Sequence, residues 1–130
     1  MPKPESVVLM NDFSREPRSL REGMRRQFDL ILESGRYVLS SAVGNFEAQF
    51  AAMCGAHSAV GTGNGLDAIE IGLRAAGVRP GDEVITTSVT AVATVIGIIR
   101  SGAKPVIADI DPSTGLLDMD SAERCITTRT

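Results

Sequence analysis

The sequence feature that most constrains the fold is a run of alternating glycines, Gly61, Gly63 and Gly65. The apolar residues before it, 56–60, predict a strand, and the apolar spacing after it predicts a helix that extends to Ala76. The start of a helix has N–H groups without partners and a partial positive charge, and glycines let a ligand come close to the backbone. A strand, a glycine turn and a helix N-terminus in this order predict a site for an anion.

Two amphipathic helices are predicted before the glycine turn. The first follows a capping box formed by Ser19 and Glu22, and it ends at Gly35. The second runs from about Asn45 to Cys54, because apolar residues recur there at helical spacing. The remaining segments of this part are predicted to be extended, as an arm or edge strand over 1–13 and a short piece over 37–39.

After the glycine turn, strands and helices alternate at the spacing of βαβ units. Strands over 82–87 and 105–108 flank a helix over 90–100, which is apolar almost all round, so we expect it to be buried on more than one side. A last helix over about 120–126 is capped by Asp118 or Asp120. The predicted class is α/β, with a mostly parallel sheet flanked by helices.

Composition and charge exclude several kinds of partner. The 130 residues are 43% hydrophobic and 22% charged, which is typical of a soluble globular domain. A net charge of −3 leaves no basic footprint for nucleic acid or an anionic membrane. The longest apolar run, 91–99, is too short to cross a bilayer, and the N-terminus lacks a signal-peptide pattern. We therefore expect a cytoplasmic protein without nucleic-acid or membrane partners.

No metal site is predicted. Asp109 and Asp111 follow a strand but have no third ligand at useful spacing, so they indicate a turn. Cys54 and Cys125 are far apart and do not have the spacing of metal ligands. His57, the sole histidine, indicates a surface or capping residue more than a catalytic base.

The glycine turn itself admits more than one ligand. A dinucleotide fingerprint fails, because Leu66 stands where the third glycine should be and the nearby acids, Asp82 and Glu83, begin a strand instead of following it. A P-loop fails because no Gly-Lys-Ser/Thr follows. Two interpretations stay open from the residues alone: a cradle for a cofactor phosphate, or a tight turn in which Asp67 complements the helix dipole. The Asp67 carboxylate would repel a phosphate unless it points away.

Several blocks in order resemble the DegT/StrS family of pyridoxal-phosphate-dependent sugar aminotransferases, from about Ser34 to Thr130. The matching blocks are Gly35-Arg-Tyr-Val-Leu, Phe46-Glu-Ala-Gln-Phe-Ala, Val60-Gly-Thr-Gly-Asn-Gly-Leu-Asp-Ala, Pro80-Gly-Asp-Glu-Val-Ile-Thr, Thr90-Ala-Val-Ala-Thr, Gly102-Ala-Lys-Pro-Val-Ile-Ala-Asp-Ile-Asp and Ile126-Thr-Thr-Arg-Thr. The resemblance implies the N-terminal part of the fold-type-I, aspartate-aminotransferase-like large domain. It further implies an N-terminal arm and helix over 1–34 and an incomplete cofactor-binding domain over 35–130.

The resemblance also implies a reaction and a set of site residues. Pyridoxal 5′-phosphate would take an amino group from an amino-acid donor such as glutamate and pass it to a nucleotide-linked keto-sugar. By position, Gly65, Leu66 and Asp67 would hold the phosphate, mainly through backbone N–H groups, and Ala91 would lie against the ring. The complete protein would be a homodimer with sites at the subunit interface.

The chain departs from the family pattern at several points. Ala91 replaces an aromatic residue that stacks on the ring in many relatives, Leu66 replaces a threonine, and Ser40 replaces a glycine. The family's catalytic lysine and the aspartate that pairs with the pyridine nitrogen come later than Thr130. Neither Lys3 nor Lys104 matches that lysine, so we expect no catalytic residue within this chain and no activity from it alone. A non-catalytic regulator or scaffold, or another fold-type-I enzyme, remains an alternative.

Overall fold

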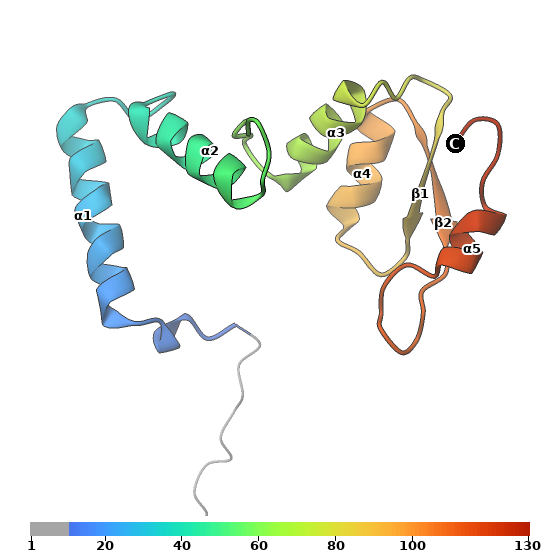
Figure 1. Cartoon of the computed structure of the whole chain (residues 1–130), viewed down its shortest axis with the longest axis horizontal. Helices are drawn as coiled ribbons and strands as arrows, with labels where there is room; N and C mark the ends of the chain where they lie inside the picture. Colours follow the sequence, from blue (N-terminus) through green and yellow to red (C-terminus); the bar gives the residue numbers. More distant parts are fainter. Residues whose placement is uncertain (1–10) are drawn as a thin grey trace, which may run out of the picture. The chain divides into compact units, whose positions relative to one another are not determined.

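The computed structural model describes residues 11–130, and the chain divides into two compact units, 1–60 and 61–130 (Figure 1). Each unit is described by itself. The apolar patch at 7–10, predicted as part of an arm or edge strand, lies outside the described residues. Within residues 11–130, no helix combines the length and the apolar character that crossing a membrane requires.

The first unit contains η1 (Phe13–Arg15), α1 (Arg18–Ser34) and α2 (Ser41–Met53). As predicted, α1 ends at Gly35, which adopts the left-handed conformation with φ of 62°. The predicted capping box is wrong, because Pro17 occupies the N-cap and Ser19 already lies inside the helix. The Glu22 carboxylate instead accepts a hydrogen bond from the Arg18 side chain at 2.8 Å.

The extended segments predicted between the two helices and after them are wrong. Leu39 has φ of 50°, the left-handed conformation, and residues 56–60 form no strand. A strand needs a neighbour to pair its backbone groups, and the paired strands of the described region both lie beyond Gly61. The second helix is confirmed, although α2 begins at Ser41 and not at the predicted Asn45.

The second unit is a βαβ arrangement with an additional helix on each side in sequence. Its elements are α3 (Gly65–Ala75), β1 (Glu83–Thr87), α4 (Val92–Arg100), β2 (Lys104–Ala108) and α5 (Met119–Arg124). The two strands are parallel and in register from Glu83–Lys104 to Thr87–Ala108. This confirms the α/β class, the parallel sheet and all five predicted elements of this part. Of the two candidate caps for α5, Asp118 is correct: its carboxylate accepts from the N–H groups of Asp120 and Ser121.

The core of the second unit lies where α4 packs between α3 and β2. Ile98 is 2% exposed, and the small residues Ala103, Ala108 and Ala122 are also buried. Gly97 lets the two helices approach, since a Cβ on it would lie 2.8 Å from Ile69 Cγ2. The prediction that α4 is buried on more than one side is confirmed, since it contacts both α3 and β2, but the burial is incomplete, because Val92 is 73% exposed. Complete burial of an apolar helix requires packing on every side, whereas α3 and β2 cover only part of the α4 surface.

Glu83 ties the last residues of the chain to the start of β1. Its buried carboxylate accepts hydrogen bonds from the Thr127 hydroxyl at 2.6 Å and from the Arg129 guanidinium at 2.9 Å. Its backbone N–H donates to the Arg129 carbonyl at 2.8 Å, and Lys104 Nζ lies 3.6 Å from Oε1. The hydrogen bond from Thr127, together with the charge and hydrogen bond of Arg129, lowers the pKa of the Glu83 carboxyl below its usual value.

Candidate functional site

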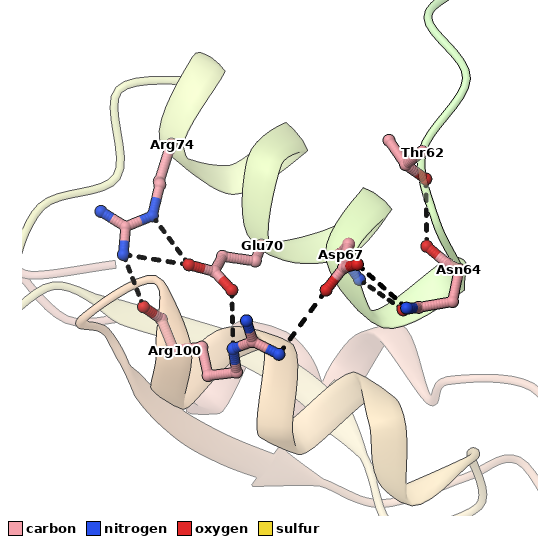
Figure 2. Close-up of polar contacts among 6 residues, drawn as sticks. All are labelled: Thr62, Asn64, Asp67, Glu70, Arg74 and Arg100. Atoms are coloured by element: carbon pink, nitrogen blue, oxygen red, sulfur yellow. Dashed lines mark hydrogen bonds and ion pairs between the residues drawn. The ribbon is translucent and has the colours of Figure 1, made fainter. Parts of the chain in front are cut away.

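The glycine turn leads directly into α3, as predicted, and Asn64 organises the junction (Figure 2). Asn64 has extended backbone, with φ of −167° and ψ of 173°, and serves as the N-cap. Its side-chain oxygen accepts a hydrogen bond from the Asp67 N–H at 2.9 Å. The Thr62 hydroxyl donates to the Asn64 carbonyl oxygen at 3.0 Å, which fixes the turn from the other side.

The first turn of α3 has three N–H groups without an acceptor in the helix backbone, and one of them, that of Asp67, is capped by the Asn64 side chain. The first intrahelical bond runs from the Ala68 N–H to the Asn64 carbonyl oxygen at 3.1 Å. Helix geometry therefore leaves the N–H groups of Gly65 and Leu66 at the open end, where the helix dipole adds partial positive charge. The N–H of Asp67 is engaged by Asn64, so its predicted role as a phosphate donor would require Asn64 to release it.

The Asp67 carboxylate folds back over the glycine turn. Its Oδ2 accepts a hydrogen bond from Asn64 Nδ2 at 2.9 Å and would lie 3.3 Å from a Cβ built on Gly63. The absence of a side chain on Gly63 therefore makes room for this carboxylate. Its other oxygen, Oδ1, lies 3.5 Å from the guanidinium of Arg100 at the end of α4.

Arg100 belongs to a charged network between α3 and α4 (Figure 2). Its Nε lies 2.8 Å from Oε2 of Glu70, and the other oxygen of Glu70 lies 3.1 Å from the Arg74 guanidinium. Arg74 also donates to the carbonyl oxygen of Arg100 at 2.7 Å. The network therefore joins the first turn of α3 to the last turn of α4.

Ala91, the fourth predicted site residue, lies at the start of a different helix. It is the N-cap of α4, with φ of −63° and ψ of 140°, and it follows the carboxyl end of β1. Beside it, the hydroxyl oxygens of Thr90 and Thr94 lie 2.9 Å apart. Gly65, Leu66 and Asp67 thus form one helical turn, whereas Ala91 lies at the N-terminus of the neighbouring helix.

The sequence reasoning missed Asn64 and Arg100. The signal for Asn64 was present, because asparagine directly before a helical pattern is a preferred N-cap. No local signal pointed to Arg100, which meets Asp67 only because α3 and α4 pack together. Among residues 11–130, no group of His, Cys, Asp and Glu side chains could hold a metal ion.

These residues fit a phosphate group in part and oppose it in part. The glycine turn, two N–H groups and the positive end of a helix favour an anion. The Asp67 carboxylate opposes one, but it is paired with Arg100. The N–H groups at the start of α3 could therefore bind a phosphate, since the negative charge of Asp67 beside them is offset by Arg100.

Comparisons with known proteins place the chain among aminotransferases. A model of the DegT/DnrJ/EryC1/StrS aminotransferase family matches residues 18–130. The chain is 46% identical to a protein of Geobacillus stearothermophilus named pleiotropic regulatory protein, over 95% of this chain and 33% of that protein. It is 40% identical to the dTDP-3-amino-3,6-dideoxy-alpha-D-galactopyranose transaminase of Aneurinibacillus thermoaerophilus, over 89% of this chain and 31% of that protein.

Among solved structures, the chain resembles NtdA from Bacillus subtilis with its bound cofactor PMP. The TM-score is 0.80 at 29% sequence identity, and the match covers 93% of this chain and 30% of that one. The chain therefore spans about a third of the length of the relatives it matches.

Proposed function

The chain belongs to the DegT/DnrJ/EryC1/StrS aminotransferase family, and on that basis we propose that the protein carrying it aminates a nucleotide-linked keto-sugar. The amino group comes from an amino-acid donor such as glutamate. Pyridoxal 5′-phosphate, when bound, supplies the electron sink that lets an amino group pass from donor to acceptor. The observation that carries the proposal is the family match, which extends over the glycine turn and both strands.

Within this chain, the residues bind and orient the cofactor. The N–H groups of Gly65 and Leu66 hold the phosphate, and Asp67 closes the turn through its contact with Asn64. Ala91 would lie against the ring, where its methyl group cannot stack as an aromatic side chain would. We also propose the domain division that the resemblance implies, with an arm and helix over 1–34 and an incomplete cofactor-binding domain over 35–130.

The proton transfers of the reaction need a catalytic lysine, and we propose that neither lysine of this chain serves as one. Lys104, one of its two lysines, lies at the start of β2, where its Nζ is 3.6 Å from the Glu83 carboxylate. Its side chain is 69% exposed, in agreement with a solvated surface role. We therefore propose that the 130 residues alone are inactive, and that the complete protein is a cytoplasmic homodimer.

The proposal is tested by the amino-donor half-reaction. The protein carrying this chain is loaded with pyridoxal phosphate and mixed with glutamate, and the cofactor's absorbance spectrum and the release of 2-oxoglutarate are followed. We expect conversion of the cofactor to its amino form, and reversal when a nucleotide-linked keto-sugar is added. The 130-residue chain is the control, and we expect no conversion from it. A loaded protein that leaves glutamate unchanged would contradict the proposal.

A regulatory role is the second candidate, and one observation favours it. The 46% identical relative from Geobacillus stearothermophilus is named a pleiotropic regulatory protein. Ala91 in place of a ring-stacking residue agrees with a protein that binds the cofactor without turning it over. In that case the protein carrying this chain would bind pyridoxal phosphate and give no 2-oxoglutarate. Another fold-type-I enzyme would consume an amino donor but reject keto-sugars.

A further inference from the structure

The Asp67 carboxylate creates an electrostatic conflict at the proposed phosphate site. Its Oδ2 is held over the glycine turn by Asn64 Nδ2 at 2.9 Å, close to where Gly63 lacks a side chain. The carboxylate is 33% exposed, so water screens it only partly. A negative charge suits a helix N-terminus in the absence of a ligand, but it opposes a phosphate there.

Arg100, at the end of α4, reduces this repulsion because its positive charge lies beside the Asp67 carboxylate. One guanidinium nitrogen lies 3.5 Å from Asp67 Oδ1, and Nε lies 2.8 Å from Glu70 Oε2 (Figure 2). The Glu70 side chain is 17% exposed, so it gives the guanidinium a shielded anchor. Arg100 is thereby held in a position from which it attracts the Asp67 carboxylate toward α4.

We propose that Arg100 is a positioning residue for the cofactor phosphate, acting through Asp67. It draws the carboxylate toward α4 and offsets its charge, so that the Gly65 and Leu66 N–H groups can donate hydrogen bonds to an anion. The inference rests on the proposed function, since it concerns the same phosphate. All the residues involved lie in the unit 61–130.

The experiment compares two ligands that differ only in the phosphate, pyridoxamine 5′-phosphate and pyridoxamine. Neither ligand can form a Schiff base with a lysine, so binding reports on non-covalent contacts. Dissociation constants for the protein carrying this chain, freed of cofactor, are measured by ligand fluorescence at constant pH and salt. The variants are Arg100→Gln, Asp67→Asn and the double variant. Arg74→Gln is the matched control, because Arg74 has similar exposure and also pairs with Glu70, but makes no contact with Asp67 in the network.

We expect the wild-type protein to prefer the phosphorylated ligand. Arg100→Gln should weaken its binding by about two- to fivefold, the usual size of a charge effect at a helix end, and leave pyridoxamine binding unchanged. In the Asp67→Asn background the same substitution should have no effect, and Arg74→Gln should change neither ligand. Urea unfolding of each variant verifies that it is folded.

Two results would overturn the inference, and they are distinct. An equal loss from Arg100→Gln with and without the Asp67 carboxylate would show that Arg100 does not act through Asp67, and the proposed phosphate site would survive. A wild-type protein with no preference for the phosphorylated ligand would remove the phosphate site itself, and the role of Arg100 with it.

Discussion

At the scale of single residues, the helix start depends on Asn64 more than on the glycines that mark it in the sequence. Glycines permit the turn, but the Asn64 side chain satisfies the Asp67 N–H and also donates to the Asp67 carboxylate. This reciprocal pair resembles a capping box in which aspartate replaces the usual glutamate. Asn64 thus caps α3 and also holds the Asp67 carboxylate in place.

Asn64→Ala should lower the free energy of unfolding by about 1 kcal/mol, the usual cost of losing a side-chain N-cap. Asn64→Ser keeps an acceptor for the Asp67 N–H and serves as the control, with a smaller loss. Urea denaturation followed by circular dichroism measures both. Equal losses from the two variants would mean that the cap hydrogen bond does not stabilise α3.

Ala91→Phe should strengthen binding of pyridoxamine phosphate. An aromatic ring at this position could stack on the pyridine ring, which contributes about 1 kcal/mol, or roughly a fivefold lower dissociation constant. Val89→Phe is the control, since Val89 is 58% exposed and lies just before α4. A gain of the same size from both variants would show that added hydrophobic surface, and not stacking at position 91, causes the effect.

At the scale of elements, the close contact of α3 with α4 depends on Gly97. A Cβ at this position would lie 2.8 Å from Ile69 Cγ2 and 3.3 Å from the Leu66 carbonyl oxygen. The atoms in its way belong to the first two turns of α3. The packing that stabilises the second unit therefore also determines where the proposed phosphate site lies.

Gly97→Ala should destabilise the chain by roughly 1–2 kcal/mol, because the overpacking outweighs the better helix propensity of alanine. Gly72→Ala, on α3, is the opposite case, since a Cβ there meets nothing within 4 Å. That substitution should raise the free energy of unfolding by about 0.5–1 kcal/mol. If both variants were stabilised, the close helix contact would not exist in solution.

The Glu83 contacts predict a contribution to the free energy of unfolding that is lost at low pH. The folded-state pKa of Glu83 is lowered by the Thr127 hydrogen bond and by Arg129. Its contribution is therefore present above the unfolded-state pKa of about 4.3, and it is lost as the pH falls through the lower folded-state value. Asp111, whose pKa is lowered by hydrogen bonds from Ser113, titrates in the same direction. The comparison must therefore isolate Glu83.

Glu83→Gln should be less stable than the wild type at about pH 7, and the difference should shrink at about pH 3. Because Asp111 is present in both proteins, its contribution cancels in the difference. Thr127→Val removes the main hydrogen bond and should reduce the same pH dependence. Urea unfolding at a series of pH values measures it. A difference between wild type and Glu83→Gln that does not change with pH would contradict the assignment.

The elements predicted correctly are those whose signals are local. The start of α3 at the glycine turn, the cap of α5 (Asp118, one of two candidates) and the apolar strand 105–108 each depend on a few neighbouring residues. The strand expected over 56–60 had a similar local signal but was wrong: β1 and β2 pair with each other, and residues 56–60 pair with no strand of the described region. The ion pair of Arg100 with Asp67 was missed because it arises only from packing between two helices.

At the scale of the whole chain, large apolar side chains remain exposed in both units. In the first unit, Met24, Phe28 and Phe46 are each about 60% exposed, at 59%, 61% and 62%. In the second unit, Val92 and Ile99 on α4 are 73% and 56% exposed. Exposed apolar surfaces of this kind mark contacts with other protein surfaces. This agrees with a chain that spans about a third of its relatives.

We therefore expect the 130-residue chain to self-associate or to be only marginally stable. Sedimentation velocity should show an average mass that rises with protein concentration, because association buries apolar surface that water now contacts. Phe28→Glu places a charge on the exposed stripe of α1 and should shift the chain toward the monomer. Gln27→Glu adds the same charge one residue away, at a position that is already polar, and should change little. A wild-type chain that stays monomeric at all concentrations and unfolds cooperatively would mean that these side chains are tolerated in water. The exposed apolar side chains of α1 would then not mark a contact with another protein surface.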